Sequence, residues 1–367
     1  MSILIFFLVL FALVLVHEWG HFIAAKKTGM RVDEFGIGFP PRLFSFKKNE
    51  TEYSFNALPI GGFVRIYGEN AADAAMDAGS GSNISCSFTA KSKWAQALVL
   101  VAGVTMNVLF AWFLFVVAFS VGVPTAVDEN EASPNAELVV QSVLADGPAA
   151  EAGLVTGSVI TGVEIDGNVV DALKPSAFRS TTEERGSNPI QITYRTPEGV
   201  VATKDVTPVT GLALDEPDRA VVGVSLSLVE TTRESIPVAM LSAFNQTWYM
   251  LKAITVGITT LIVGSFAGTA DFSSVTGPIG IVGLVGDAAA FGFTSLLLFT
   301  AMISLNLAVI NLLPFPALDG GRLVFVAIEA VTKRSIAPVW VARLNTLGFV
   351  LLMALMIAVT YRDIIRL

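Results

Sequence analysis

The sequence predicts a polytopic α-helical membrane protein with one folded domain inserted between its membrane-spanning helices. Hydrophobic residues make up 53% of the 367 residues and charged residues only 15%, with a mean hydropathy of +0.67. Soluble domains are about 45–50% apolar and about 25% charged. Several apolar stretches also approach or exceed the roughly 20 residues that cross a bilayer, and an acidic segment with strand and turn signals separates the second of them from those that follow.

The first apolar stretch carries an H-E-x-x-H pattern, His17-Glu18-Trp19-Gly20-His21. Positions i and i+4 share one face of a helix, so both imidazoles can reach one zinc ion, with Glu18 beside them as a candidate general base. These are the only two histidines in the chain, and ionisable groups at membrane depth are functional by default. The pattern favours a metal site. The alternative is a helix whose histidines and glutamate make polar contacts inside a bundle.

Residues 1–25 are expected to form a retained first transmembrane helix and not a cleaved signal peptide. No basic segment precedes the apolar run and no small-x-small cleavage site follows it. Lys26, Lys27 and Arg31 come next, so the positive-inside rule places this end in the cytoplasm and the N-terminus outside.

Residues 30–93 are expected to contain a cytoplasmic β region. Gly and Pro punctuation and alternating apolar residues predict extended segments at 32–41, 43–46, 51–55 and 58–64, with 43–46 and 51–55 forming a hairpin. An exposed strand edge here could hold an unwound substrate by strand addition. A plain hairpin without that role is the alternative. Residues 71–87 are small and polar, and predict a mobile loop.

A second span is expected over residues 95–123, with Gly103 and Asn107 inside it. A buried Asn in a membrane helix can tie two helices together, at about 0.6 kcal/mol. It can instead hydrogen-bond a substrate carbonyl or an oxyanion. From the residues alone, the helix-tying role is favoured.

The segment 124–235 holds 18 Asp/Glu and 7 Lys/Arg, against 7 and 9 in residues 26–93, and is expected to be a folded extracytoplasmic domain. It reads as a strand at 138–143, a turn at 146–148, a helix at 149–152, a strand at 159–165 and a turn at 166–167. This order, over about residues 135–230, resembles PDZ domains of the protease-associated kind. Such domains usually bind peptide ends by strand addition, although a purely steric role over the active site fits equally well.

Residues 236–263 are apolar but interrupted by polar side chains, and are expected to form an amphipathic interfacial helix. A true span here would invert the topology of everything that follows. Residues 276–281 predict a turn-rich loop.

The second half of the site is expected within residues 293–321. Asn306 and Asn311 interrupt an apolar helix, and Pro314 and Pro316 then break it, which is tolerated at membrane depth only where the backbone is buried in protein or faces a cavity. Two histidines need a third protein ligand, and Asp319 is the best-placed carboxylate. The alternative for Asp319 is an N-cap of the helix that follows. A last span is expected at 339–360, after the cytoplasmic Lys333-Arg334.

H-E-x-x-H, N-x-x-P-x-P-x-L-D-G-G, a PDZ-like domain and the G-P-I-G-I loop together resemble the bacterial site-2 protease family, of the regulator of sigma-E (RIP metalloprotease) type with one PDZ domain. The resemblance covers essentially the whole chain. It implies zinc ligands at His17, His21 and Asp319, with Glu18 as catalytic base. It also implies substrate-facing roles for Asn107, Asn306, Asn311, Pro314, Pro316, and for Gly36 and Gly38 in a membrane-associated β region. The family's G-P-x-x-N reads Gly103-Val104-Thr105-Met106-Asn107 here, so its Pro is lost.

The predicted fold is therefore a polytopic α-helical membrane protein of about four transmembrane helices, with a membrane-associated β region and one inserted extracytoplasmic PDZ-like α+β domain. Its expected parts are an N-terminal membrane core (1–127), the PDZ-like domain (128–232), an interfacial helix with a connecting loop (233–292) and a C-terminal membrane core (293–367).

The predicted function is zinc-dependent hydrolysis of peptide bonds within transmembrane segments, in the inner membrane of a bacterium. Zn²⁺ would polarise the scissile carbonyl and activate water, with Glu18 as the base. The resemblance suggests anti-sigma factors or remnant signal peptides as substrates, and no nucleic acid partner is expected. One alternative is a catalytically silent membrane scaffold that presents the PDZ-like domain. A zinc transporter or sensor is another, although it would need more His or Cys residues along a path.

Overall fold

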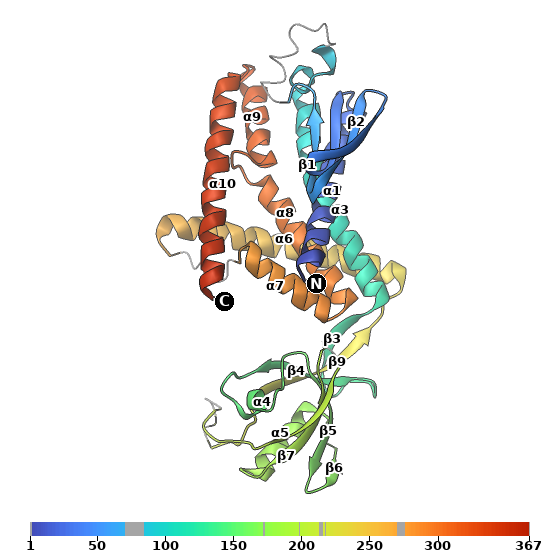
Figure 1. The fold of residues 1–367 in the computed structure, drawn as a ribbon, viewed down its shortest axis with the longest axis vertical. Coiled ribbons are helices and arrows are strands. Elements are labelled where there is room, and N and C mark those ends of the chain that lie inside the picture. Colours follow the sequence, from blue (N-terminus) through green and yellow to red (C-terminus); the bar gives the residue numbers. More distant parts are fainter. Residues whose placement is uncertain are drawn as a thin grey trace. The chain divides into compact units, whose positions relative to one another are not determined.

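The computed structural model describes residues 2–69, 84–171, 173–197, 199–212, 216, 218–269 and 276–366 (Figure 1). The chain divides into two compact units. Unit 1 comprises Met1–Val117, Ile236–Ala289 and Leu296–Leu367, and unit 2 comprises Ala118–Ser235 and Ala290–Ser295.

Five helices in the described part of the chain are long and apolar enough to cross a membrane. They are α1 (Ser2–Lys27), α3 (Lys93–Val121), α6 (Ile236–Ala267), α8 (Phe293–Leu312) and α10 (Pro338–Arg366). Two shorter helices, α7 (Pro278–Ala290) and α9 (Asp319–Thr332), precede and follow α8. The chain is a multi-pass membrane protein.

Helix α6 differs from the other long helices in how it packs. Its buried residues are Ala239, Ala243 and Thr247, spaced four apart along one side of its first half. Trp112 of α3 donates its indole N–H to the Met240 carbonyl at 3.2 Å. None of its most apolar 18-residue window is buried, and Figure 1 shows α6 running across the direction of α10. By length and composition α6 is a fifth candidate span, whereas its packing is that of a helix lying across the bundle.

The β region is a long antiparallel hairpin of β1 (Val32–Lys48) and β2 (Thr51–Ile66). The predicted hairpin is confirmed, and residues 58–64 continue β2 instead of forming a separate strand. Phe35 faces Val64 on one side and Tyr53 on the other, because β2 curls around the first half of β1. The first half of β1 therefore has a partner along both edges.

The hairpin packs on α1 and the start of α3 through one apolar cluster. Its fully or nearly buried members include Ala25, Met30, Val32, Ile66 and Val99. Gly36 allows the tight pairing within the hairpin, since a Cβ there would lie 2.3 Å from the Phe63 ring. Gly38 has a positive φ of 80°, and its Cβ would lie 2.7 Å from the Leu58 carbonyl oxygen. Both glycines are needed where the two strands approach closely.

Unit 2 is built on an antiparallel sheet of order β3-β9-β4-β5-β7-β8, with β6 paired to β5. The strands are β3 (Val123–Val127), β4 (Glu137–Val143), β5 (Val159–Ile165), β6 (Asn168–Val170), β7 (Ile190–Arg195), β8 (Val201–Val206) and β9 (Val224–Thr232), with helices α4 (Pro148–Glu151) and α5 (Pro175–Arg185). Val140, Val163 and Ile192 are fully buried in its core. The predicted strands at 138–143 and 159–165 and the helix near 149–152 are confirmed. The predicted turn follows from Asp166 and Gly167, which both have positive φ.

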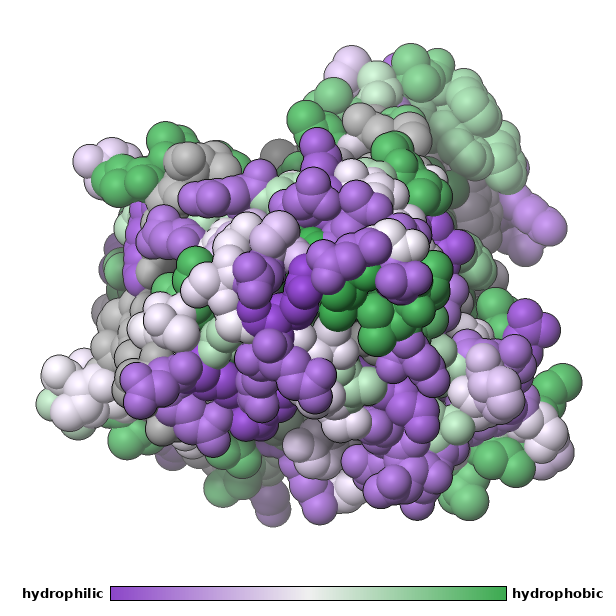
Figure 2. Space-filling model, turned by 90° about the horizontal axis from the view of Figure 1, so that it is seen from below, coloured by the Kyte–Doolittle hydropathy of each residue, from purple (hydrophilic) through white to green (hydrophobic). Residues whose placement is uncertain are grey.

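The outside of unit 2 matches its acidic composition. Figure 2 shows a mainly hydrophilic face with a smaller apolar patch. Ion pairs such as Arg185–Asp166 and Arg195–Glu137 lie on its surface. A water-exposed folded domain has this kind of surface.

The predicted loop at 276–281 is wrong, because Pro278 begins helix α7. The cap comes from the far end of the chain. Asp363 of α10, only 8% exposed, accepts hydrogen bonds from the backbone N–H groups of Gly277 at 3.1 Å and Gly280 at 2.9 Å. A nearby Ser or Asp usually supplies such a cap. Here the cap comes from a residue distant in sequence, so no local signal predicted the start of this helix. In the other predicted loop, 71–87, residues 71–83 lie outside the described residues, and Ile84–Cys86 form a short 3₁₀ helix.

Replacing Asp363 with Ala should loosen the first turn of α7, because two backbone donors lose their acceptor. A lost cap costs about 0.5–2 kcal/mol. Hydrogen exchange at residues 277–281 of the purified protein is expected to speed up by roughly tenfold. Asp287→Ala, which removes an exposed carboxylate from the same helix, is the control and should leave exchange there unchanged. Equal exchange in the two variants would show that Asp363 does not cap α7.

Candidate metal centre

Three side chains from two distant helices converge at one point in unit 1. His17 Nε2 lies 3.0 Å and His21 Nε2 lies 3.3 Å from Asp319 Oδ2, and the two Nε2 atoms are 3.1 Å apart. Among the described residues, this is the one group of three or more His, Cys, Asp or Glu side chains close enough to share a metal ion. Zinc bonds of about 2.0–2.1 Å in tetrahedral geometry place ligand atoms about 3.3 Å apart. The donor set therefore fits a zinc ion with one coordination position left open.

Helix α1 supplies both imidazoles because His17 and His21 lie one turn apart. Both are 8% exposed. The Nδ1–H of His21 donates to the Val99 carbonyl of α3 at 2.8 Å. A carbonyl can only accept, so this bond puts the proton on Nδ1 and leaves the Nε2 lone pair for a metal.

Asn107 of α3 lies at the corresponding nitrogen of His17. Its amide nitrogen lies 3.3 Å from His17 Nδ1, while its amide oxygen is buried without a hydrogen-bond partner. When His17 holds a metal through Nε2, its Nδ1 carries a proton and needs an acceptor. A 180° rotation of the Asn107 amide brings its oxygen to that proton and satisfies both groups. The Asn107 backbone carbonyl also accepts from Ser304 Oγ at 2.8 Å, which ties α3 to α8.

Glu18 lies beside the donor set and is held by the β region. Its Oε2 accepts from the Val64 backbone N–H at 3.1 Å. One edge of β2 near Val64 pairs with β1. The Val64 N–H points away from β1, so it belongs to the other, outer edge of β2. This outer edge therefore faces the Glu18 carboxylate at Val64.

Asp319 is positioned by the break between α8 and α9. It is the first residue of α9, the N-cap is Leu318, and no side chain caps the helix. The N-cap alternative for Asp319 is therefore wrong, and its carboxylate points to the imidazoles. The two glycines that follow it are steric requirements: a Cβ on Gly320 would lie 2.2 Å from the Leu313 carbonyl oxygen, and one on Gly321 would lie 2.2 Å from that of Phe315. The loop folds back onto the first turn of α9.

Helix α10 supports the same loop from outside, a contact that no sequence motif predicted. A Cβ on Gly348 would lie 2.4 Å from the Pro316 carbonyl oxygen, so the loop rests directly on α10. The Ala317 N–H donates to Asn345 Oδ1 at 3.2 Å, and Ala317 itself has a positive φ of 76°. An Asn in an otherwise apolar span was the signal available for Asn345, as it was for Asn107.

Gly103 and Gly20 let α1 and α3 meet at the site. A Cβ on Gly103 would lie 2.4 Å from His21 Nε2, and one on Gly20 would lie 2.4 Å from the Ala102 carbonyl oxygen. The helices therefore touch backbone to backbone beside the imidazoles.

The remaining predicted substrate residues are spread over two places. Asn306 donates to the Met302 carbonyl of its own helix at 2.9 Å. Asn311, Pro314 and Pro316 lie on the segment that leads from α8 to Asp319, and Pro314 is exposed. Gly36 and Gly38 lie on β1, behind the edge that faces Glu18.

Known proteins resemble this chain over nearly its whole length. It matches Peptidase family M50 over residues 5–355. A protein of Clostridium perfringens named as a zinc metalloprotease is 37% identical, over 96% of each chain. The zinc metalloprotease RasP of Oceanobacillus iheyensis is 28% identical, over 100% of this chain and 99% of the relative. The regulator of sigma-W protease RasP of Bacillus subtilis is 27% identical, also over 100% and 99%.

One solved structure, the PDZ domain of an SdrC-like protein from Listeria monocytogenes, matches 26% of this chain and 92% of its own at 21% identity. Its TM-score is 0.21, which does not decide the fold of unit 2, so the PDZ-like character of that unit stays a prediction. The family match is stronger evidence than this structural match, because it spans both membrane motifs and the segment between them. The resemblance to the site-2 protease family is confirmed: the chain belongs to peptidase family M50 and is a zinc metalloprotease.

Proposed function

We propose that the protein is an intramembrane endopeptidase that hydrolyses peptide bonds within transmembrane segments of other proteins. The observation that carries the proposal is the position of the donor set. His17 and His21 lie well inside α1, a helix of 26 residues that is apolar enough to span a bilayer. A protease site at that depth meets peptide bonds of membrane segments. The complete donor set, with Glu18 beside it, speaks against a catalytically silent scaffold.

The chemistry is divided between the metal and Glu18. His17, His21 and Asp319 would hold a zinc ion, which as a Lewis acid would polarise the scissile carbonyl and lower the pKa of water towards ~7. Glu18 accepts the proton of the attacking water and delivers it to the leaving amide nitrogen. The hydrogen bond from Val64 occupies one carboxylate oxygen, which leaves the other to carry the proton.

Substrate presentation follows from the β region. A substrate helix must unwind before attack, and its extended backbone can add to the outer edge of β2 beside Glu18. Gly36 and Gly38 serve this role from behind, since they let β1 pair tightly with β2. Asn306 and Asn311 lie in α8, and Pro314 and Pro316 lie in the connection from α8 to Asp319. From there they can contact the opposite side of the substrate chain.

We infer four spans in a bacterial inner membrane, formed by α1, α3, the broken α8–α9 segment and α10, with α6 at the interface. Lys26, Lys27, Lys91 and Lys93, and Lys333-Arg334, mark the cytoplasmic ends. The β region is then cytoplasmic and unit 2 extracytoplasmic, where it binds peptide ends or filters substrates by size. The name of the Bacillus subtilis relative supports a substrate that controls a sigma factor, such as an anti-sigma factor. Remnant signal peptides are the second substrate class.

Glu18→Gln is expected to lower cleavage of a model single-span substrate by at least about 10²-fold, because the proton acceptor is lost. Zinc content should stay unchanged, since Glu18 is not one of the three donors. The assay uses the purified protein in detergent, with metal measured on the same samples. Glu50→Gln, which alters an exposed glutamate of the β1–β2 turn, is the control and should retain cleavage. If Glu18→Gln retains proteolysis, Glu18 is not the proton acceptor.

Asn107→Leu should weaken zinc binding about 10–100-fold, because the Nδ1–H of His17 loses its acceptor. Asn107→Asp keeps an acceptor oxygen of similar shape and should bind zinc much more tightly than the Leu variant. Competition with a zinc chelator measures the affinity without reference to activity. If both variants bind zinc like the wild type, Asn107 does not orient His17.

A further inference from the structure

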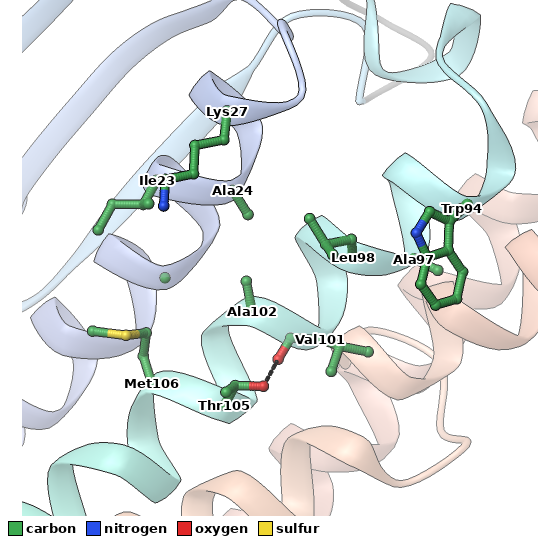
Figure 3. A pocket seen from close by; sticks show the side chains of 11 residues that line it. Ile23, Ala24, Lys27, Trp94, Ala97, Leu98, Val101, Ala102, Thr105 and Met106 are labelled. Carbon is green, nitrogen blue, oxygen red and sulfur yellow. Dashed lines mark hydrogen bonds between the residues drawn. The ribbon is translucent and has the colours of Figure 1, made fainter.

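An apolar groove lies between α1 and α3, and none of the three metal-donor residues lines it (Figure 3). Its volume is about 400 Å³, within the range of roughly 300–1,000 Å³ found for ligand sites. Helix α1 contributes Gly20, Ile23, Ala24 and Lys27, and α3 contributes one face from Trp94 to Met106. The groove runs from Gly20 and Met106 to the ends of the helices at Lys27 and Trp94.

The walls of the groove offer almost nothing to a polar ligand. Ile23, Leu98 and Val101 are representative. The polar exception is Thr105, whose hydroxyl donates to the Val101 carbonyl at 2.9 Å, as Figure 3 shows. A hydrocarbon chain can fill such a space without leaving a polar group unsatisfied.

One end of the groove carries an unpaired positive charge. Lys27 is exposed, and Figure 3 shows its side chain turned back along α1 towards Ile23. Among the residues that the structure describes, no carboxylate pairs with it. Its neighbour Lys26 pairs with Glu50 at 3.6 Å, and Lys93 pairs with Glu329 at 2.6 Å. Trp94, 79% exposed, flanks the same end. A lysine and a tryptophan at the end of apolar helices are typical of the lipid headgroup level.

We propose that this groove binds one anionic phospholipid, with an acyl chain between α1 and α3 and its phosphate at Lys27. The charge of Lys27 selects an anionic headgroup over a zwitterionic one.

A substrate helix fits the groove less well than an acyl chain. One turn of a helix about 10 Å wide and 5.4 Å long fills about 420 Å³, which is already the volume of the whole groove. The groove instead follows α3 from Trp94 to Met106, twelve residues or about 18 Å. Its volume is thus spread along a thin path, which suits a single chain.

The bound lipid would support the helix pair that carries the metal site. Gly20 and Ala102 line the groove, and the next residues along each helix are His21 and Gly103. These two lie side by side, since a Cβ on Gly103 would lie 2.4 Å from His21 Nε2. An acyl chain in the groove fills the space where α1 and α3 separate. This inference concerns lipid binding and holds independently of which peptide bonds the enzyme cleaves.

The test is native mass spectrometry of the full-length protein. The protein is first equilibrated in detergent with an equimolar mixture of phosphatidylglycerol and phosphatidylcholine, and the unbound lipid is then removed. Wild type is expected to retain one phosphatidylglycerol per chain in preference to phosphatidylcholine. Lys27→Gln should reduce that preference about fivefold, the equivalent of about 1 kcal/mol for one lysine near the membrane surface. Lys26→Gln removes the same charge from the next residue, where Glu50 pairs with it, and should leave the preference unchanged. No preference in wild type, or an equal loss in both variants, would overturn the proposal.

A second variant tests the groove itself. Ala97→Phe places a ring in the groove and should abolish retention of the phospholipid. Lipid retained as in wild type would show that the phospholipid sits elsewhere. If this variant instead retains the lipid and loses cleavage of a single-span substrate, the groove holds the substrate and the proposal fails. Absence of the preference in the wild type overturns the proposal even if a variant does not fold.

Discussion

The structure depends on one convergence, in which two imidazoles of α1 meet a carboxylate that lies 302 residues after His17 in the chain. The helices must approach so closely that a Cβ is excluded at several positions around the site. Gly20 and Gly103 keep α1 and α3 in contact, Gly320 lets the loop before Asp319 fold onto α9, and Gly348 lets that loop rest on α10. The L-D-G-G motif is thus a packing requirement as much as a ligand motif.

Several polar groups around the metal site are satisfied by a different segment of the chain. The His21 ring donates to the Val99 carbonyl, Ser304 donates to the Asn107 carbonyl, and Asn345 accepts from Ala317. Each such bond is worth only about 0.6 kcal/mol in a membrane, yet leaving the buried group unpaired would cost more. The same bonds set the directions in which the donor atoms point. Stability and metal geometry therefore rest on the same contacts.

Local patterns predicted most of the elements and the donor set. The i, i+4 spacing of His17 and His21 predicts their shared face, and alternation predicts the β hairpin and β5. The missed features depend on partners that are distant in sequence. Asp363 caps α7 from 83 and 86 residues away, and β2 covers both edges of β1 at Phe35. For α6, the polar side chains within the apolar run predict an interfacial helix, and the burial of only Ala239, Ala243 and Thr247 agrees with that prediction. Length and mean apolarity by themselves would favour a span.

X-ray absorption at the zinc edge of the purified, zinc-loaded protein tests this convergence most directly. Two imidazole nitrogens and light oxygen scatterers at about 2.0–2.2 Å are expected, with no sulfur. In Asp319→Ala the zinc should be lost, or should keep two imidazoles with one oxygen fewer. A sulfur scatterer, or one imidazole or none, would contradict the convergence of His17, His21 and Asp319 on one zinc ion.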